Sequence, residues 1–366
     1  MAAAALAAVD PERLVREELA RRPTRFDAIV AVGKAAAAMA RGAGRLFEEA
    51  SRCLLIRPDT SPALSAPGWE ELTGGHPLPD RASVAAGERL ASWLEEIGPD
   101  ETLLALVSGG GSACVELPAP GVTLDGLIRA NRELLASGLP IGEINRVRKR
   151  LSALKDGGAL RRVRGRVLVL LLSDVPGDDP ATIASGLFFS PEVETVLLGG
   201  AGTAVAGASD EALRQGFAVT RGDLTGEASR AAMDLVARGR TLEGPRVALV
   251  LGGETSVILG NSPGRGGRNG ELALAAAREL ADSPPEAEEV VLALATDGED
   301  GATGTAGAVV DGGAWEAILR AGIDPGEALS RHDSLAALEK VPGALLRTGV
   351  TGTNVGDFVI GLCYAA

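Results

Sequence analysis

The chain contains very few of the residues that bind zinc or form disulfides, with three cysteines and two histidines among 366 residues. Cys53, Cys114 and Cys363 show no CxxC spacing, and together with His76 and His332 they cannot supply a plausible zinc cluster. A small, odd number of cysteines is typical of the reducing cytoplasm, and no charged segment followed by an apolar one marks a signal peptide. We therefore expect a cytoplasmic protein without structural zinc.

Long apolar runs and positive charge are also scarce. No apolar run reaches about 18 residues, the length that a membrane span requires, so no membrane partner is expected. The net charge of −13 argues against a dedicated nucleic-acid binder, although a local basic pocket can still receive an anionic substrate. The chain has 46% hydrophobic residues and 49 glycines, which is the composition of a globular α/β protein.

Short apolar runs alternate with amphipathic stretches, which indicates mostly parallel sheets with helices on both faces. The runs span 28–32, 53–56, 102–107, 167–172, 195–198, 247–251 and 290–295. The length predicts two domains, and the polar stretch 237–246 is the best candidate linker. We expect a Rossmann-like, doubly wound α/β domain of six strands in residues 1–236, and a smaller, glycine-rich α/β domain in residues 237–366.

Lysine is scarce as well, since only four of the 36 basic residues are lysines. One of them, Lys34, lies between the run 28–32 and a predicted helix, whose N-terminal amides would attract anions. A solvated lysine at a strand end is the competing interpretation. The surrounding sequence is not a Walker A motif, because Ala35 stands where serine or threonine is required.

A serine- and glycine-rich loop directly follows the run 102–107. Its bare amides can approach a ligand closely and its hydroxyls are further donors, as in phosphate-binding loops at the carboxyl edge of a sheet. A tight turn would need only one glycine, so three favour a binding loop. The predicted substrate- or phosphate-binding residues here are Ser108, Gly109, Gly110, Gly111 and Ser112.

Five basic residues fall between positions 146 and 155. Asn145 is expected to be a helix N-cap, and Arg146, Lys149 and Arg150 would share one helix face by their i, i+3 and i+4 spacing. This is either a solvated face or one that meets a phosphate or carboxylate, and both interpretations stay open. Asn145, Arg146 and Arg150 are therefore predicted substrate- or phosphate-binding residues.

Acidic residues follow two of the predicted strands. Asp174 stands just after the run 167–172, where a carboxylate can bind Mg²⁺ or accept a proton from a substrate hydroxyl. An aspartate-rich turn is the alternative. Asp297 and Asp300, in ATDGEDGATG, suit Mg²⁺ bound with water and nucleotide phosphates, so we predict them as metal ligands.

An arginine–glycine loop, GRGGRNG, opens the helix predicted at 269–280. Two guanidiniums beside bare amides make a site for the charge of a transferring phosphoryl group, and a flexible surface loop is the alternative. Glu254, in GGETS, is a predicted substrate-binding residue. The predicted nucleotide-binding residues are Gly266, Gly267, Asn269, Thr351, Thr353 and Asn354.

Two further features of the sequence give weaker evidence of function. Gly200-Ala-Gly-Thr-Ala-Val205 follows a predicted strand and precedes Asp223 by about twenty residues, close to a dinucleotide fingerprint. Val205 takes the place of the third glycine, which would crowd the helix against the strand. His76 stands alone in a rigid turn, GGHPLPD, and is expected to be structural.

Nine segments together resemble the class II glycerate kinases, or glycerate 2-kinases, which end in a MOFRL domain. They occur in that family's order over roughly residues 25–366. The segments are VGKA, GGHPLPD, SGGGSA, EINRVRKRLSALK, SDVPGDDPATIASG, LGGETSV, GRGGRNGELALA, ATDGEDGATGTAGAVVD and TGVTGTNVGD. One departure is Cys114, Val115 and Glu116, where small and apolar residues are expected.

The resemblance implies phosphorylation of D-glycerate at its 2-hydroxyl with ATP and Mg²⁺, in a cleft between the two domains. It implies Lys34 and Arg268 as catalytic residues. In that reaction Asp174 would accept the hydroxyl proton, while Arg146 and Arg150 would hold the carboxylate. The expected partners are the nucleotide and glycerate, and a homodimer is an open expectation.

Two other functions stay open at this point. An NAD(P)-dependent hydroxypyruvate reductase, a name under which family members have also been catalogued, would hold a pyrophosphate on the loop 200–205. A non-catalytic sensor of a phosphorylated acid would bind its ligand without turnover. Such a sensor would not need the acidic loop 296–300 to bind metal.

Overall fold

The computed structural model describes residues 1–22, 24–44, 46, 50–136, 141–259, 263–283 and 287–365, and the chain divides into two compact units. The N-terminal unit comprises Asp10–Gly200 with Gly352–Asn354. The C-terminal unit comprises Met1–Val9, Ala201–Thr351 and Val355–Ala366.

The boundary expected at residue 237 lies inside the C-terminal unit. β7 (Ala218–Leu224) pairs in parallel with β8 (Arg246–Gly253), and α10 (Ala228–Arg240) packs against α11 (Arg268–Ala281). Residues 201–236 therefore complete the second sheet and its helical layer. The pairing of β7 with β8 sets the boundary between the two units. The polar stretch 237–246 therefore does not mark that boundary.

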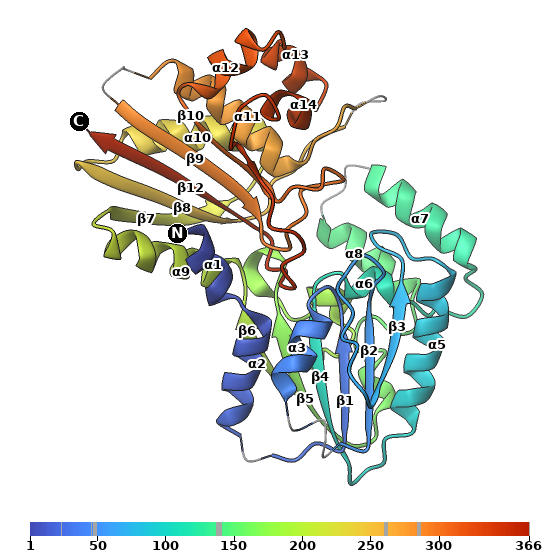
Figure 1. Cartoon of the computed structure of the whole chain (residues 1–366). Coiled ribbons are helices and arrows are strands. Elements are labelled where there is room, and N and C mark those ends of the chain that lie inside the picture. Colours follow the sequence, from blue (N-terminus) through green and yellow to red (C-terminus); the bar gives the residue numbers. More distant parts are fainter. Residues whose placement is uncertain are drawn as a thin grey trace. The chain divides into compact units, whose positions relative to one another are not determined.

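Six parallel strands in the order β3-β2-β1-β4-β5-β6 form the N-terminal sheet (Figure 1). They are β1 (Ala28–Val32), β2 (Arg52–Pro58), β3 (Trp69–Gly74), β4 (Thr102–Ser108), β5 (Arg166–Leu172) and β6 (Glu194–Gly199). This is the order of the doubly wound nucleotide-binding fold, so the Rossmann-like prediction is confirmed. The sequence pattern missed β3 because this edge strand is mostly half-exposed and has no apolar run.

Mostly short helices cover the N-terminal sheet. They are α2 (Pro11–Ala20), α3 (Ala36–Ala43), α5 (Arg81–Glu95), α6 (Gly111–Cys114), α7 (Leu124–Ala136) and α8 (Ile141–Arg150), with the 3-10 turns η1 (Leu160–Arg162), η2 (Pro176–Asp178) and η3 (Ile183–Gly186). α3 packs against β1, β2 and β4, and α5 packs against β3. Asp10 caps α2, because its carboxylate accepts a hydrogen bond from the Glu12 amide at 3.0 Å.

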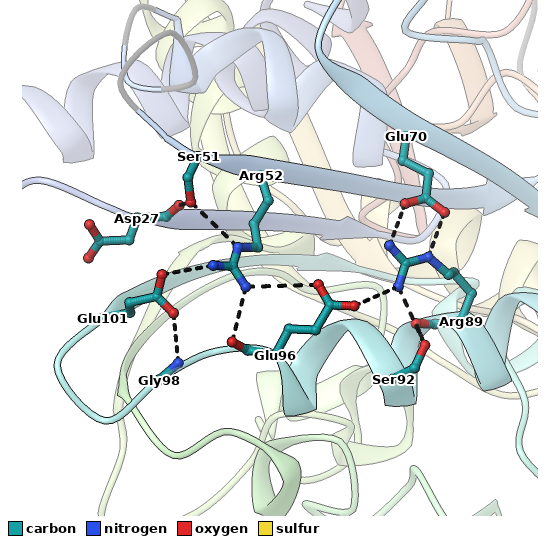
Figure 2. Close-up of polar contacts among 9 residues, drawn as sticks. All are labelled: Asp27, Ser51, Arg52, Glu70, Arg89, Ser92, Glu96, Gly98 and Glu101. Carbon is teal, nitrogen blue, oxygen red and sulfur yellow. Dashed lines mark hydrogen bonds and ion pairs between the residues drawn. The ribbon is translucent and has the colours of Figure 1, made fainter.

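Ion pairs link the amino end of this sheet, as Figure 2 shows. Arg52, at the start of β2, donates to the Glu101 carboxylate at 2.9 Å and to the Glu96 carbonyl at 3.1 Å. Arg89 forms a bidentate pair with Glu70 at 2.7 and 2.8 Å. These charged side chains bind one another, which is typical of a stabilising edge and not of a ligand site.

The C-terminal sheet is mixed, in the order β11-β10-β9-β12-β8-β7 (Figure 1). Its remaining strands are β9 (Ala287–Ala295), β10 (Gly307–Asp311), β11 (Leu345–Leu346) and β12 (Asp357–Ala365). β12 runs antiparallel to β8 and β9, and β10 runs antiparallel to β9 and β11. The expectation of a mostly parallel sheet is wrong for this unit, because β9 and β10 are joined without a crossover helix and the chain simply reverses.

The helices of the C-terminal unit include the first helix of the chain. They are α1 (Ala2–Ala8), α9 (Ala201–Arg214), α10, α11, α12 (Ala314–Arg320), α13 (Pro325–Ser330) and α14 (Ser334–Leu338). α1 packs on α9, and a Cβ at Gly207 would lie only 2.5 Å from the Ala8 Cβ, so glycine permits this close approach. Within the described residues, no helix combines the length and apolar character needed to cross a bilayer.

Candidate functional site

The loops after β1 and β4 meet at the centre of the N-terminal sheet. β2 and β4 flank β1 on opposite sides, and ligands of open α/β sheets bind at the carboxyl ends of strands at such a reversal of strand order. The Lys34 amide donates to the Gly109 carbonyl at 2.8 Å. The Ala35 amide donates to the Ser108 hydroxyl at 3.0 Å. The two predicted segments are therefore held together as one loop pair.

Two functional side chains pack against the backbone of this loop pair. A Cβ at Gly110 would lie 2.9 Å from Lys34 Cγ, and a Cβ at Gly109 would lie 1.7 Å from Asp174 Oδ2. Asn354 Nδ2 donates to the same Asp174 oxygen at 3.0 Å. The side chain of a lysine and the carboxylate of an aspartate thus lie against neighbouring glycines of one loop. A carboxylate can accept a proton and a lysine can stabilise a developing negative charge.

The hydroxyls of the two serines in this loop already lie within hydrogen-bond distance of other protein groups. Ser108 is fully buried, and its hydroxyl accepts from Ala35. The Ser112 hydroxyl lies 2.7 Å from that of Ser185. Gly111 begins the four-residue helix α6, and a Cβ there would lie 3.0 Å from the Ala184 Cβ. Any ligand contact of this loop therefore depends on its backbone amides more than on its hydroxyls.

The His76 ring lies near the same loop, because a Cβ at Gly110 would be 3.6 Å from His76 Nε2. The isolation of His76 in the sequence predicts a structural role and does not reveal this position. The fold brings it beside the loop that holds Lys34.

α8 begins at Ile141, four residues before Asn145. Asn145 therefore lies inside the helix, and its assignment as an N-cap is wrong. Asn145, Arg146 and Arg150 do lie together, in an open pocket of about 610 Å³, which we call the basic pocket. It also contains Lys155 and Arg161, which the sequence pattern did not assign to a site.

Arg268, the first residue of α11, is held by two carboxylates in the C-terminal unit. Its Nη2 lies 2.7 Å from Glu254 Oε1 and 3.0 Å from Asp357 Oδ1, and its Nε donates to Asp357 Oδ2. Burial alone would lower the pKa of this guanidinium, but the charges of Asp357 and Glu254 outweigh burial and raise the pKa. The predicted residues Arg268 and Glu254 are thus in contact, and Asp357 is a site residue that the sequence analysis missed.

Asp300 caps the start of α11. Its Oδ1 accepts from the Asn269 amide at 2.9 Å and its Oδ2 from the Gly270 amide at 2.7 Å. Burial raises the pKa of Asp300 to about 6, although these hydrogen bonds act in the opposite direction. A Cβ at Gly267 would lie 2.3 Å from the Asp300 carbonyl oxygen, so a glycine is needed there. Asp300, a predicted metal ligand, therefore also fixes the start of α11.

Mg²⁺ at kinase sites keeps several waters and binds through one or two carboxylates plus phosphates. Within the described ranges, no group of three or more His, Cys, Asp or Glu is arranged to hold a metal. Asp297 is half-buried in the same loop, and its Oδ1 accepts from the Glu299 amide at 3.0 Å. Asp297 fits a single-carboxylate contact with Mg²⁺. Asp300 stays a predicted second ligand, although each of its oxygens already accepts a hydrogen bond from an α11 amide.

We expect the Asp300 carboxyl to make the protein less stable as pH rises. Its folded-state pKa of about 6 lies above its ordinary value of 3.8, so its stabilising contribution is full below that ordinary value and is lost as pH rises through 6. The free energy of unfolding of the wild type, minus that of Asp300→Asn, should fall by about 2 kcal/mol between pH 4.5 and 7.5. Urea unfolding measures it, and a difference that stays constant or grows with pH would contradict this expectation.

A second pocket, of about 440 Å³, lies at the start of α11, and we call it the α11 pocket. Three of the predicted site residues line it, namely Gly266, Gly267 and Arg268. Its other lining residues were missed by the sequence analysis, and they include Thr255, Glu271, His332, Val257, Leu259 and Pro263. They come from three separate segments of the chain, so no single motif could have revealed them.

Buried polar groups face one another in or near the α11 pocket. Thr255 is 5% exposed, and its hydroxyl has no hydrogen-bond partner among the described residues. His332 Nδ1 lies 3.1 Å from Glu271 Oε1, and burial raises the pKa of the Glu271 carboxyl. His332 also has a φ of +54°, a conformation that most side chains avoid. A buried hydroxyl without a partner indicates that a ligand group can complete this pocket.

The three residues predicted from TGVTGTNVGD lie in different surroundings. The Thr351 hydroxyl donates to the Thr296 carbonyl at 2.5 Å in the C-terminal unit. Thr353 is buried, and Asn354 orients Asp174 in the N-terminal unit. Asn354 is therefore placed beside Lys34 and its loop, and not in the α11 pocket.

The near-fingerprint at residues 200–205 does follow β6 and open α9. Asp223, however, lies on β7, and β6 and β7 belong to different sheets. In a dinucleotide-binding βαβ unit, the acidic residue follows the second strand of the same parallel sheet. This stretch therefore lacks the context that would make it a dinucleotide site.

Comparison with known proteins covers both parts of the chain. The family described as "Domain of unknown function (DUF4147)" matches residues 1–197, and the MOFRL family matches residues 247–357. A D-glycerate 2-kinase from Thermotoga maritima is 36% identical over 97% of this chain and 95% of its own length. A protein named putative hydroxypyruvate reductase from Agrobacterium vitis is 36% identical over 97% of this chain and 91% of its own. The crystal structure of a glycerate kinase from Thermotoga maritima matches with a TM-score of 0.86 and 34% identity, over 98% of this chain and 96% of that one.

Proposed function

Because the chain belongs to the glycerate 2-kinase family and is a small-molecule kinase, we propose that it transfers the γ-phosphoryl group of ATP to the 2-hydroxyl of D-glycerate. The products would be 2-phosphoglycerate and ADP. The observation that carries this proposal is the packing of Lys34 and Asp174 against Gly109 and Gly110. A cytoplasmic location and a homodimer remain predictions from the sequence.

We assign the proton transfer to Asp174. As the glycerate oxygen bonds to phosphorus, its hydroxyl proton passes to the Asp174 carboxylate, and the bond from phosphorus to the ADP oxygen breaks. The Asn354 amide, 3.0 Å from Asp174 Oδ2, holds the carboxylate in one orientation. The Lys34 ammonium stabilises either the charge on the transferring phosphoryl group or the substrate carboxylate.

In the C-terminal unit we assign nucleotide binding to the α11 pocket. Because the Asn269 and Gly270 amides at the start of α11 already donate to Asp300, we assign the phosphates to the glycine loop that precedes the helix. The apolar side chains of Val257, Leu259 and Pro263 suit a nucleobase, and the Thr255 hydroxyl suits a polar group of the nucleoside. Arg268 adds a guanidinium at the phosphate end.

Mg²⁺, when bound, neutralises charge on the nucleotide phosphates, and Asp297 is the residue that we propose to hold it. Glu254 and Asp357 keep the Arg268 guanidinium in a fixed orientation. A guanidinium fixed in this way needs little rearrangement when charge develops, which is the property that favours phosphoryl transfer.

The test is to incubate the purified protein with ATP, Mg²⁺ and D-glycerate and to identify the product by ³¹P NMR. A 2-phosphoglycerate signal supports the proposal, whereas 3-phosphoglycerate would keep the kinase and reverse the substrate orientation. In the same assay, Asp174→Asn should lose at least about tenfold in kcat/KM, equivalent to about 1.4 kcal/mol. A smaller loss would remove Asp174 as the base.

The hydroxypyruvate reductase remains the competing activity because a relative carries that name. Quenching of the tryptophan fluorescence by NADH, together with NADH oxidation by hydroxypyruvate, would favour it over the kinase. A non-catalytic sensor would bind phosphorylated acids with no product in either assay. The separation of β6 and β7 into different sheets speaks against a dinucleotide site at residues 200–205.

A further inference from the structure

The basic pocket concentrates positive charge in an acidic protein. Five cationic side chains line it in a chain whose net charge is −13. They are Arg146, Lys149, Arg150, Lys155 and Arg161. Asp156 is the carboxylate in the same lining. A pocket with this composition attracts anions even though the protein as a whole repels them.

One side of the pocket is buried, whereas Arg150 and Arg161 lie exposed at its surface. Lys155 is 3% exposed, and its ammonium lies 2.6 Å from the fully buried Glu116 carboxylate. The amides of Asp156 and Gly157 donate to the carbonyls of Ser185 and Gly186, at 3.0 and 2.7 Å. The turn after α8 is thus fixed to the turn η3. The ammonium of Lys155 is held in one position by its ion pair with Glu116.

Backbone strain is concentrated in the same two turns. Asp156, Ala184 and Ser185 have φ angles of +54°, +46° and +56°, which residues with side chains rarely adopt. Such conformations persist where the surrounding structure enforces them, and they gather at ligand-binding sites. The Ser185 hydroxyl lies 2.7 Å from Ser112, so the strained turn also borders the loop that holds Lys34.

Two guanidiniums in this pocket lack a carboxylate partner among the described residues. Arg146 pairs with Glu143 at 2.5 Å and Lys149 with Asp156 at 3.1 Å, and Lys155 pairs with Glu116. Arg161 donates to the Asp156 carbonyl at 2.7 Å, and Arg150 has no ion pair in the described part of the chain. Two unmatched positive charges suit a doubly charged phosphate group better than a single carboxylate.

We propose that the basic pocket binds a phosphate group, with Arg150 and Arg161 as its principal contacts. This replaces the assignment of Arg146 and Arg150 to the glycerate carboxylate. The proposal rests on the proposed function only for the source of the phosphate, which would be phosphoglycerate or the nucleotide. The recognising chemistry, paired guanidiniums around phosphate oxygens, is the same for both.

The experiment is calorimetric titration of the full-length protein, without turnover, using inorganic phosphate, 2-phosphoglycerate, ADP and D-glycerate in separate runs. Arg150→Gln should weaken binding of at least one phosphate compound by about tenfold or more, and leave D-glycerate unchanged. Lys149→Gln should weaken the same compound, because it removes a neighbouring charge. The matched control is Arg129→Gln, an exposed arginine on α7 outside the pocket, which should change nothing.

The compound whose affinity falls identifies the source of the phosphate. Unchanged affinity for all three phosphate compounds in both pocket variants would overturn the proposal, as would a loss confined to D-glycerate. Because no product is measured, the titration can succeed even if the kinase assay fails. In that case the phosphate site would stand and the proposed reaction would not.

Discussion

Replacing Lys34 with alanine is expected to lower kcat for D-glycerate phosphorylation by about 10³-fold or more. Lys34 is half-buried and its side chain packs against the loop after β4, since a Cβ at Gly110 would lie 2.9 Å from Lys34 Cγ. Water that enters the space would not replace a fixed charge. Steady-state kinetics with varied glycerate and saturating ATP would measure the effect.

The division between kcat and KM decides which charge Lys34 stabilises. A fall in kcat at constant KM assigns it to the transferring phosphoryl group, and a rise in the KM for glycerate alone assigns it to the carboxylate. Lys340→Ala is the control, since Lys340 is exposed at the end of α14. If Lys34→Ala keeps both constants while it folds normally by circular dichroism, Lys34 has no part in the reaction.

Glu116→Gln is expected to have the largest effect on stability, a loss of about 3–5 kcal/mol. Glu116 is fully buried, and its Oε2 lies 2.6 Å from the Lys155 ammonium, itself 3% exposed. Removing the carboxylate charge leaves an uncompensated ammonium in the interior. No other charge then offsets the cost of desolvating this ammonium. Urea unfolding of the wild type and the variant measures the change in the free energy of unfolding.

A double variant separates the charge from the packing. Glu116→Gln with Lys155→Met removes both charges, and most of the stability should return because no ion is left buried. The exposed pair of Arg230 and Asp234 provides the control, and Asp234→Asn should cause no measurable change. A loss below about 1 kcal/mol in Glu116→Gln would show that the pair is hydrated in solution.

The central strands could be predicted from sequence because a strand that is buried on both faces consists of a continuous apolar run. β1 and β4 carry such runs and are buried at every position. β3 and β7 are edge strands with exposed or half-exposed faces, and their sequences WEELTG and AVTRGDL contain no such run. Missing β7 also displaced the expected domain boundary, because its pairing with β8 ties residues 201–236 to the second sheet.

The candidate site was predictable where its parts follow a strand directly. Lys34, the loop 108–112 and Asp174 all come just after apolar runs, so the edge rule for parallel sheets placed them together. Partners far apart in sequence could not be found in this way. Asn354 lies 180 residues from Asp174, and Asp357 lies 89 residues from Arg268. Lys155 lay beyond the predicted basic face and reaches the pocket only because the chain turns after α8.

The packing of α1 on α9 has a consequence for synthesis of the chain. α1 is translated before α9, and its docking surface on α9 begins only at residue 201. At about 5–20 residues per second, the helix waits roughly 10–40 s for its partner. The residues of α1 therefore pack only after strands β1 to β6 have been translated, and a fragment that begins at residue 201 would leave the surface around Gly207 uncovered.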